Sequence, residues 1–194
     1  MVGRLLVITG ASGVGKSTLT ARLAASLEID KVVSSDTIRE TLRTQISKEE
    51  SPALHRSSFQ PAGAGAIGDW KETVAPLKDA IQAVVNREKE RGGSLLMEGV
   101  HFIPNLGIID DWRAAGGNAC GVVLAVEDDE EHVRMIVGRR KHNGRPVRHY
   151  LDHIGRIREI QDEMVRLADN NGWLVLDITK SDNLIGKIEG YLNA

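Results

Sequence analysis

The sequence predicts one α/β domain in three layers, with helices on both faces of a five-stranded parallel sheet. Five short apolar segments alternate with segments of helical pattern, and this alternation is typical of strand–helix–strand units in a parallel sheet. The 194 residues also suffice for one sizeable core, so residues 1–194 are expected to form a single domain.

The expected strands are short apolar runs, as buried parallel strands require. They cover residues 5–8, 31–34, 94–97, 120–126 and 173–178. The expected helices between and after them cover residues 16–27, 37–45, about 69–91, 107–115, 130–141, 150–170 and 183–192. Ligands collect at the carboxyl ends of parallel strands. Functional residues are therefore expected directly after the strands.

The segment 10–17 reads GASGVGKS and fits the phosphate-binding pattern G-x-x-x-x-G-K-[ST]. It follows the first expected strand, and leucines recur behind it at helical spacing, so the strand–loop–helix context is present. The loop is therefore expected to bind ATP with Mg2+. Its glycines turn backbone N–H groups toward the β-phosphate, Lys16 reaches the β- and γ-oxygens, and Ser17 is the expected Mg2+ ligand. The expected nucleotide-binding residues are Gly10, Ser12, Gly13, Val14, Gly15, Lys16, Ser17 and Thr18.

The composition is that of an ordinary soluble globular protein. Hydrophobic residues make up 41%, charged residues 27% and aromatic residues 4% of the chain, and the net charge is -2. A pI near 6.3 and the few aromatic residues do not favour a nucleic-acid partner. An anionic substrate must therefore be met by local basic residues.

The apolar runs and the single cysteine indicate a cytoplasmic protein. Cys120 lies within an apolar strand pattern and is expected to be an inert buried thiol outside any disulfide framework. The first apolar run is only four residues long, too short for a signal-peptide core or a membrane span. No membrane partner is expected.

Asp36 and Arg39 follow the second expected strand at the start of a helix, and their three-residue spacing puts them on one helix face. A carboxylate opposite a γ-phosphate can accept the proton of a substrate hydroxyl, and a nearby arginine can hold a substrate anion with two hydrogen bonds. The alternative is structural, because Asp caps helix N-termini and often pairs with an arginine three residues on. The position after the second strand favours the catalytic interpretation.

Glu98 ends the apolar run of the third expected strand and precedes Gly99. It is expected at the sheet edge where Mg2+ and the γ-phosphate lie, either to bind the metal through water or to polarise the attacking hydroxyl. The pattern leaves open whether Asp36 or Glu98 is the base. His101 is a candidate for substrate contact, although a lone histidine beside a strand end is often only structural.

Six basic residues fall within residues 134–148, where the segment 143–146 reads NGRP and interrupts the helical pattern. Helix, break and helix with basic side chains is typical of a mobile lid, expected at about 139–149. Closure of such a lid brings arginines to the charge that develops on the transferring phosphoryl group and expels water. Arg139 and Arg140 are the expected catalytic cations of the lid.

Three other segments complete the candidate residues. Residues 47–68 form an irregular stretch rich in Ser, Pro, Gly and Ala, and insertions of this length are often binding elements. This stretch is the expected acceptor-binding insertion. Arg156 and Arg158, on the last long helix, are expected to form surface ion pairs of little energetic weight. Residues 179–181, after the last strand, are a weak candidate for an adenine pocket.

Several of these stretches also match those of a known family. They are GASGVGKS at 10–17, VSSDTIRE at 33–40, SPALHRSS at 51–58, EGVHFIP at 98–104 and IGRIREIQ at 154–161. With them the chain resembles the P-loop small-molecule kinases and, within these, the archaeal-type 2-phosphoglycerate kinases. The first stretch is shared by a very large superfamily, and the second by several kinase groups. The third and fourth are narrower. Members of that family often carry an additional N-terminal region, whereas the first strand here is expected at residue 5.

The resemblance implies a P-loop NTPase fold of the nucleoside- and shikimate-kinase type with a lid. It implies ATP- and Mg2+-dependent phosphorylation of the 3-hydroxyl of 2-phosphoglycerate, giving 2,3-bisphosphoglycerate. Asp36 and Arg39 would then face the acceptor, a small phosphorylated or carboxylate metabolite. By their charge and polarity, His55, Arg56 and Ser57 in the insertion are expected to hold its phosphate and carboxylate.

Two other functions remain open on the sequence. The first is a kinase acting on a polynucleotide 5′-hydroxyl or, like the zeta toxins, on a nucleotide sugar. Its polynucleotide form fits poorly with the acidic pI and the few aromatic residues. The second is a nucleotide-binding NTPase switch without a phosphate acceptor. Such switches usually present a water-positioning residue and a partner surface, and neither signature is recognisable here.

Overall fold

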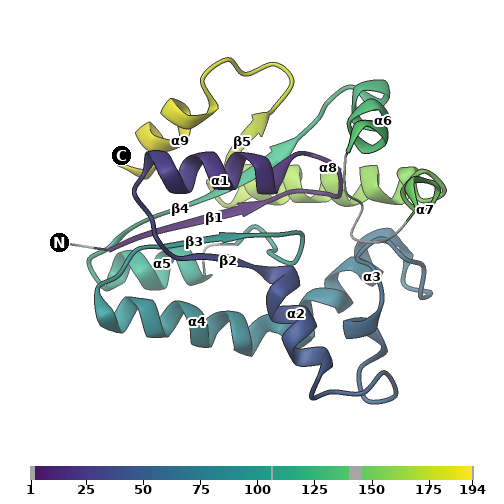
Figure 1. The fold of residues 1–194 in the computed structure, drawn as a ribbon, viewed down its shortest axis with the longest axis horizontal. Helices are drawn as coiled ribbons and strands as arrows, with labels where there is room; N and C mark the ends of the chain where they lie inside the picture. Colours follow the sequence, from purple (N-terminus) through teal and green to yellow (C-terminus); the bar gives the residue numbers. More distant parts are fainter. Residues whose placement is uncertain (1–2, 106, 140–145, 194) are drawn as a thin grey trace.

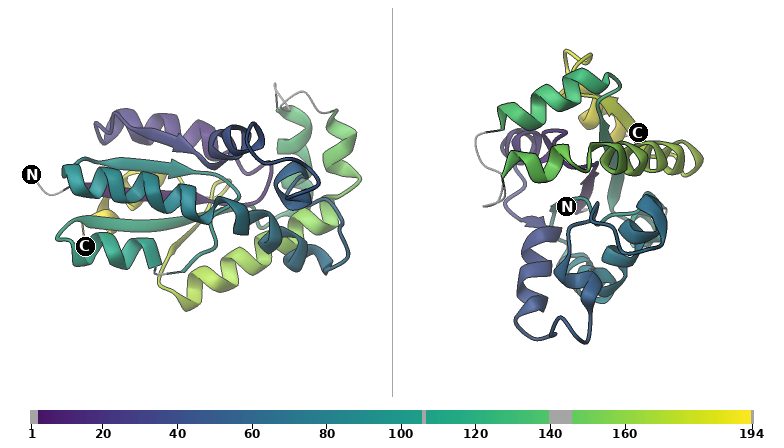
Figure 2. Two further views of the ribbon diagram at one scale, coloured as in Figure 1. Left: turned by 90° about the horizontal axis from the view of Figure 1, so that it is seen from below. Right: turned by 90° about the vertical axis from the view of Figure 1, so that its right-hand side faces the viewer.

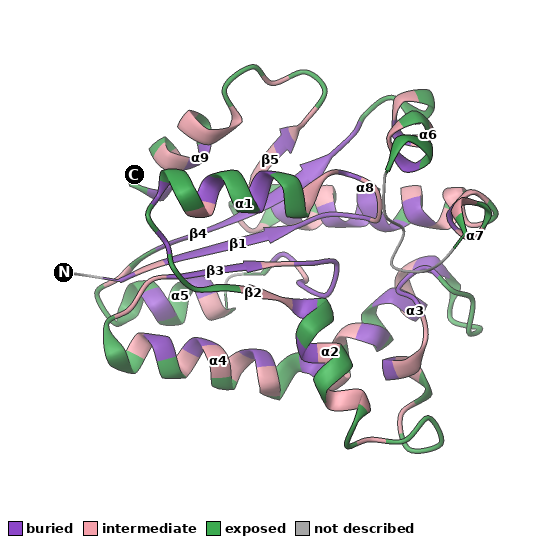
Figure 3. Cartoon of the chain, in the orientation of Figure 1, coloured by how far each residue is buried: buried purple, intermediate pink, exposed green. Residues whose placement is uncertain are grey.

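The computed structural model describes residues 3–105, 107–139 and 146–193. All five expected strands are present and form one parallel sheet in the order β2-β3-β1-β4-β5 (Figure 1). The strands are β1 (Arg4–Thr9), β2 (Val32–Ser34), β3 (Leu95–Glu98), β4 (Asn118–Ala125) and β5 (Leu174–Asp177). The central strands β1, β3 and β4 are almost completely buried (Figure 3). The predicted fold class is therefore confirmed.

Helices cover both faces of the sheet, as expected. Within the described residues they are α1 (Lys16–Ser26), α2 (Ser35–Arg43), α3 (Gly65–Val74), α4 (Lys78–Arg91), α5 (Gly107–Ala114), α6 (Asp129–Gly138), α7 (Val147–Leu151), α8 (Ile154–Asn170) and α9 (Leu184–Leu192). Two short 3-10 helices, η1 (Pro52–His55) and η2 (Ala75–Leu77), lie before α3 and between α3 and α4. The expected insertion is thus irregular up to residue 64, apart from η1 and the turns around it.

Two expected helices are each divided in the structure. The pattern at about 69–91 is broken by η2 at Pro76, because a proline ring clashes with the preceding turn and provides no N–H. The pattern at 150–170 belongs to two helices, since α7 ends at Leu151 and α8 starts at Ile154 after a turn. The first division could have been expected from Pro76, whereas the second lies beside Gly155 and has no proline.

The strand alternation divides the core into two layers. Leu5 and Val7 of β1 face the layer covered by α3, α4, α5 and α8, while Leu6 and Ile8 face the layer covered by α1 and α9. Figure 2 shows these two layers from the side and from the end of the molecule. Both faces of β1 are therefore covered, and a ligand is expected at the carboxyl ends of the strands.

Cys120 is buried in β4, and desolvation raises the pKa of its thiol to about 12, so it is unreactive at neutral pH as expected. No helix within the described ranges is long and apolar enough to cross a membrane.

Candidate active site

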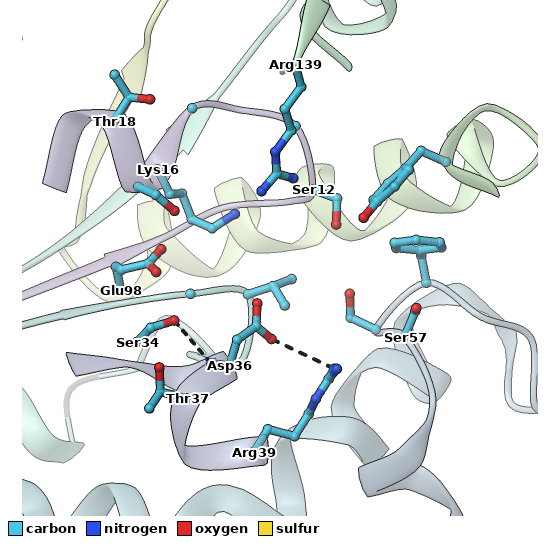
Figure 4. Close-up of a pocket in the computed structure, with 18 of the residues that line it drawn as sticks. Ser12, Lys16, Thr18, Ser34, Asp36, Thr37, Arg39, Ser57, Glu98 and Arg139 are labelled. Carbon is cyan, nitrogen blue, oxygen red and sulfur yellow. Dashed lines mark hydrogen bonds and ion pairs between the residues drawn. The ribbon is translucent and has the colours of Figure 1, made fainter. Parts of the chain in front are cut away.

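A cleft of about 1100 Å³ opens at the carboxyl ends of β1, β2 and β3. Its walls are the phosphate-binding loop, α2, the end of α6 and the segment 57–59. Figure 4 shows side chains from all of these walls pointing into it. The predicted residues that line it are Ser12, Gly13, Gly15, Lys16, Ser17, Thr18, Asp36, Arg39, Ser57, Glu98 and Arg139. The fold thus brings the two predicted halves of the site together, one around the loop and one around α2.

The phosphate-binding loop has the conformation that its glycines were expected to allow. Gly13 and Gly15 have φ angles of 95° and 78°, a region that side-chain-bearing residues rarely adopt. A Cβ atom at Gly13 would lie 2.5 Å from Cγ1 of Ile136 on α6. Gly15 is the N-cap of α1, so the loop leads directly into a helix N-terminus that favours anions. Gly10 and Val14 support the loop from beneath, since a Cβ at Gly10 would touch the buried Val14 side chain.

Lys16 lies across its own loop and donates hydrogen bonds to the carbonyls of Gly10 and Ala11, at 2.9 and 2.8 Å. Desolvation is the largest influence on its ammonium group and lowers its pKa to about 8, although Glu98 and Asp36 act in the opposite direction. A group with this pKa is charged at neutral pH but loses its proton under mildly alkaline conditions. Lys16 is therefore the most pH-sensitive cation of the cleft.

This pKa predicts a pH dependence of nucleotide binding. A bound phosphate raises the pKa of Lys16 above its value of about 8 in the free protein, so binding takes up a proton between the two pKa values. By linkage, affinity for an unreactive ATP analogue is expected to fall as the pH rises through 8 and to be nearly flat below it. Calorimetric titrations at pH 8.5 in buffers of different ionisation enthalpy measure this uptake. Its absence there, or its persistence in Lys16→Ala, would contradict the assignment.

His132 lies beneath the loop and was missed by the sequence analysis. This buried α6 residue places its Nε2 atom 2.8 Å from the carbonyl oxygen of Ser12. The carbonyl can only accept, so Nε2 carries the hydrogen. The other ring nitrogen, Nδ1, is 3.5 Å from Nη1 of Arg158. Burial is the main cause that lowers the pKa of His132, so the ring is neutral. It ties α6 to the loop.

Replacing His132 with Ala is expected to weaken ATP binding about fivefold to tenfold, because the hydrogen bond to Ser12 is worth about 1 kcal/mol. His132→Gln is the matched variant, since its amide can still donate to the Ser12 carbonyl, and it is expected to keep most of the affinity. Titration of an unreactive ATP analogue measures both. Equal losses in the two variants would show that packing rather than this hydrogen bond supports the loop.

Asp36 and Arg39 occupy the first turns of α2 and share a face, as predicted. The Oγ atom of Ser34 accepts a hydrogen bond from the Asp36 backbone N–H at 3.2 Å and caps the helix. The Asp36 Oδ1 atom is 3.8 Å from Nη1 of Arg39. The Asp36 side chain is 51% exposed and that of Arg39 only 11%. The carboxylate therefore faces the cleft, while the guanidinium forms part of its floor.

His101 lies outside the lining of the cleft. Its ring is fully buried behind the start of α2, with Nδ1 2.9 Å from Oγ of Ser35 and 3.9 Å from Oδ1 of Asp36. Desolvation is the largest influence and lowers its pKa to about 4, so the ring is neutral. In this position His101 supports the helix that carries Asp36, and its ring has no access to an acceptor in the cleft.

The insertion contributes one of its three expected residues to the cleft. His55 places Nε2 2.8 Å from the Ile46 carbonyl, and Arg56 donates to the Asp69 carbonyl and to Glu72 at 2.8 and 2.6 Å. Both side chains are engaged within the insertion and its neighbouring helix, and neither lines the cleft. Ser57 does line it, together with Ser58 and Phe59.

Arg156 corrects the expectation of a weak surface ion pair. Its Nη2 atom is 2.5 Å from Oδ2 of Asp69, whose side chain is 1% exposed. Its Nε atom donates to the Phe59 carbonyl at 2.8 Å. Asp69 also accepts from the backbone N–H groups of Ala62 and Ala64, both at 2.9 Å. Desolvation acts to raise the pKa of Asp69, but these hydrogen bonds and Arg156 lower it overall. The pair fastens the segment 59–64 to α8.

The basic segment is described only in part. Arg139 is the C-cap of α6, and Figure 4 shows its side chain reaching toward the loop. Arg140 lies outside the described residues, as do residues 141–145 of the expected lid. The Arg148 side chain is 87% exposed and lies 3.6 Å from Asp152.

Arg158, expected to form a surface ion pair, lies on α8 and pairs at 2.5 Å with Asp129.

Two residues of the cleft offer oxygen ligands to a magnesium ion carried by a nucleotide. Among the described residues, no group of three or more His, Cys, Asp or Glu side chains is arranged to hold a metal ion. Mg2+ commonly keeps several waters and binds through phosphates and one or two protein oxygens. Ser17, exposed in the first turn of α1, and Glu98 both line the cleft and offer oxygens of this kind.

Comparisons with known proteins place the chain in a family and give it named relatives. A family model described as an AAA domain matches residues 5–103, which include β1 to β3 and the segment after β3. The chain is 31% identical over 200 residues to the 2-phosphoglycerate kinase of Methanopyrus kandleri, across 98% of this chain and 61% of that protein. The corresponding protein of Methanocaldococcus jannaschii is 29% identical over 190 residues, across 94% and 61%. The chain thus spans about 60% of the length of these relatives.

A solved structure supports the fold. Shikimate kinase from Acinetobacter baumannii, in complex with shikimate, matches with a TM-score of 0.56 at 15% identity, over 100% of this chain and 94% of that one. This likeness shows a shikimate-kinase-like P-loop fold. The chain belongs to the AAA domain family, as a P-loop kinase domain homologous to the archaeal 2-phosphoglycerate kinases.

Proposed function

We propose that this protein transfers the γ-phosphoryl group of ATP to a hydroxyl of a small anionic metabolite, and that this metabolite is 2-phosphoglycerate. The observation that carries the proposal is the single cleft in which the loop with Lys16 meets the α2 face with Asp36 and Arg39. Two relatives that are about 30% identical over nearly all of this chain are 2-phosphoglycerate kinases. The proposed reaction gives 2,3-bisphosphoglycerate in the cytoplasm.

The loop side of the cleft holds the donor. The N–H groups at the start of α1 and the Lys16 ammonium bind the phosphates, and Arg139 meets the charge that develops on the transferring group. Ser17 would hold Mg2+, which would neutralise phosphate charge when bound. A second cavity of about 590 Å³ is lined by Met135, Ile178 and Thr179 among others. A Cβ atom at Gly15 would contact two of these side chains, Ile178 and Met135, and this cavity is the proposed place of the nucleotide base.

The α2 side of the cleft activates the acceptor. Asp36 is the proposed base, because it lies beside Arg39, whereas Glu98 lies beneath Lys16 on the donor side (Figure 4). Glu98 also has the larger electrostatic influence of the two on the Lys16 ammonium. The oxygen of the acceptor hydroxyl attacks the γ-phosphorus while Asp36 accepts the proton of this hydroxyl. The bond between the γ-phosphorus and the bridging oxygen of the β-phosphate breaks, and ADP is released. Glu98 would help Ser17 to hold Mg2+.

An acceptor panel tests this proposal. ADP release is measured with ATP, Mg2+ and each of 2-phosphoglycerate, 3-phosphoglycerate, D-glycerate, gluconate, shikimate, a nucleotide sugar and a 5′-hydroxyl oligonucleotide. Release that depends on 2-phosphoglycerate is expected. Release with only the oligonucleotide or the nucleotide sugar would favour those kinase classes, and release independent of every acceptor would favour an NTPase switch.

A further inference from the structure

We infer that Arg43 is a second anion-binding residue of the acceptor site and that Glu40 is its internal competitor, so that the site selects acceptors with two anionic groups. The inference rests on the proposed function. It concerns residues that lie one turn beyond the Asp36 and Arg39 pair, on the same helix.

Arg39 and Arg43 form a pair of guanidinium groups on one face of α2. They are four residues apart, so their Cβ atoms are separated by about 5–6 Å, and both line the cleft. Their side chains are only 11% and 19% exposed. The Nε atom of Arg43 donates to the Leu54 carbonyl of η1 at 2.9 Å, which fixes the plane of its guanidinium group. Nη1 of Arg39 donates to the Arg56 carbonyl at 3.5 Å. Each guanidinium group thus keeps at least one Nη atom that can meet an anion.

The anion now at this pair is the carboxylate of Glu40. Its Oε1 atom accepts from Nη1 of Arg43 at 2.7 Å and lies 3.3 Å from Nη2 of Arg39. One oxygen of the chain therefore takes the position that a carboxylate or phosphate oxygen of an acceptor would take. The Glu40 side chain is 58% exposed, so it can turn toward solvent when a stronger anion arrives.

The charges of the cleft separate into a donor group and an acceptor group. Among the described lining residues the cations are Lys16, Arg39, Arg43 and Arg139, and the carboxylates are Asp36, Glu40 and Glu98. Lys16 and Arg139 belong to the loop and to α6, where the triphosphate is proposed to bind. The two arginines of α2 remain for the acceptor. A three-carbon acid with a phosphate on the carbon next to its carboxylate spans two guanidinium groups one helical turn apart.

The experiment compares steady-state kinetics of Arg43→Gln, Glu40→Gln and the wild type with 2-phosphoglycerate and with D-glycerate, which lacks the phosphate. Arg43→Gln is expected to raise the KM for 2-phosphoglycerate about tenfold to a hundredfold, because this is what the loss of one hydrogen bond between charged groups costs in affinity. The KM for ATP is expected to change less than about twofold, because Arg43 lies on the acceptor side of the cleft. The KM for D-glycerate is expected to rise less than that for 2-phosphoglycerate, because D-glycerate lacks one of the two anionic groups. Glu40→Gln is expected to lower the KM for 2-phosphoglycerate. Arg22→Gln, an exposed change on α1, controls for loss of one positive charge.

The outcomes separate this inference from the proposed function. If the wild type phosphorylates 2-phosphoglycerate but Arg43→Gln leaves its KM unchanged, Arg43 holds no acceptor anion and the proposed function still stands. A higher KM in Glu40→Gln would show that Glu40 positions the arginines and does not compete with the acceptor. If the wild type uses no acceptor of the panel, both the inference and the proposed function fall.

Discussion

Asp36→Asn is expected to lower kcat for phosphoryl transfer by about 10²–10⁴-fold, the usual contribution of a general base. The amide keeps the size of the carboxylate and its place beside Arg39, 3.8 Å away in the wild type, but cannot take the proton of the acceptor hydroxyl. Affinity for an unreactive ATP analogue is expected to stay nearly unchanged, because Lys16 and the helix N-terminus bind the phosphates. Steady-state kinetics and an equilibrium titration measure the two quantities separately.

Glu98→Gln is the matched control for the base assignment. It removes the other carboxylate of the cleft that lies near Lys16, so it is expected to change the Mg2+ dependence of the rate more than the rate at saturating Mg2+. If Asp36→Asn kept full kcat while Glu98→Gln lost it, the roles of the two carboxylates would have to be exchanged.

Arg156→Ala is expected to destabilise the protein by about 3 kcal/mol, because it leaves the buried Asp69 carboxylate without its cation. Within the described residues, the backbone N–H groups of Ala62 and Ala64 both donate to the Asp69 carboxylate. The loss would therefore loosen the segment 59–64 and, with it, the cleft wall at Phe59. Chemical denaturation measures the free energy of unfolding, and hydrogen exchange of residues 59–64 measures the local loosening.

Arg148→Ala is the control for this prediction. Like Arg156, Arg148 lies near an aspartate, Asp152 at 3.6 Å, but the side chains of Arg148 and Asp152 are both largely exposed. Loss of the Arg148 side chain is therefore expected to change the free energy of unfolding by less than about 1 kcal/mol. Similar small effects in both variants would show that the Asp69 and Arg156 pair does not hold the insertion.

The features predicted correctly are those that local pattern encodes. The glycines, Lys16 and Ser17 of the loop all fall within residues 10–17, and the apolar runs mark the strands regardless of what they pack against. The contact between Asp36 and Arg39 was predictable for the same reason, since a spacing of three residues fixes a shared helix face. Because the carboxyl ends of parallel strands lie at the same edge of the sheet, Glu98 could also be expected near the loop.

The features that were missed depend on contacts between distant segments. His132 supports Ser12 from a helix 120 residues further along the chain, and Arg156 reaches Asp69 across 87 residues. No spacing rule connects such positions. The positive charge of Arg56 suggested that it binds the acceptor, but its Nη2 atom donates to the Asp69 carbonyl and to Glu72 instead. Arg43 is one turn beyond Arg39, and helical periodicity alone could have identified it.

The most direct test of phosphoryl transfer to an acceptor hydroxyl is 31P NMR of a reaction containing the protein, ATP, Mg2+ and 2-phosphoglycerate. The proposed reaction predicts that the γ-phosphate signal of ATP is replaced by a second phosphate monoester signal of 2,3-bisphosphoglycerate, in equal amount to the ADP formed. Growth of inorganic phosphate in its place, with 2-phosphoglycerate unchanged, would contradict the proposal.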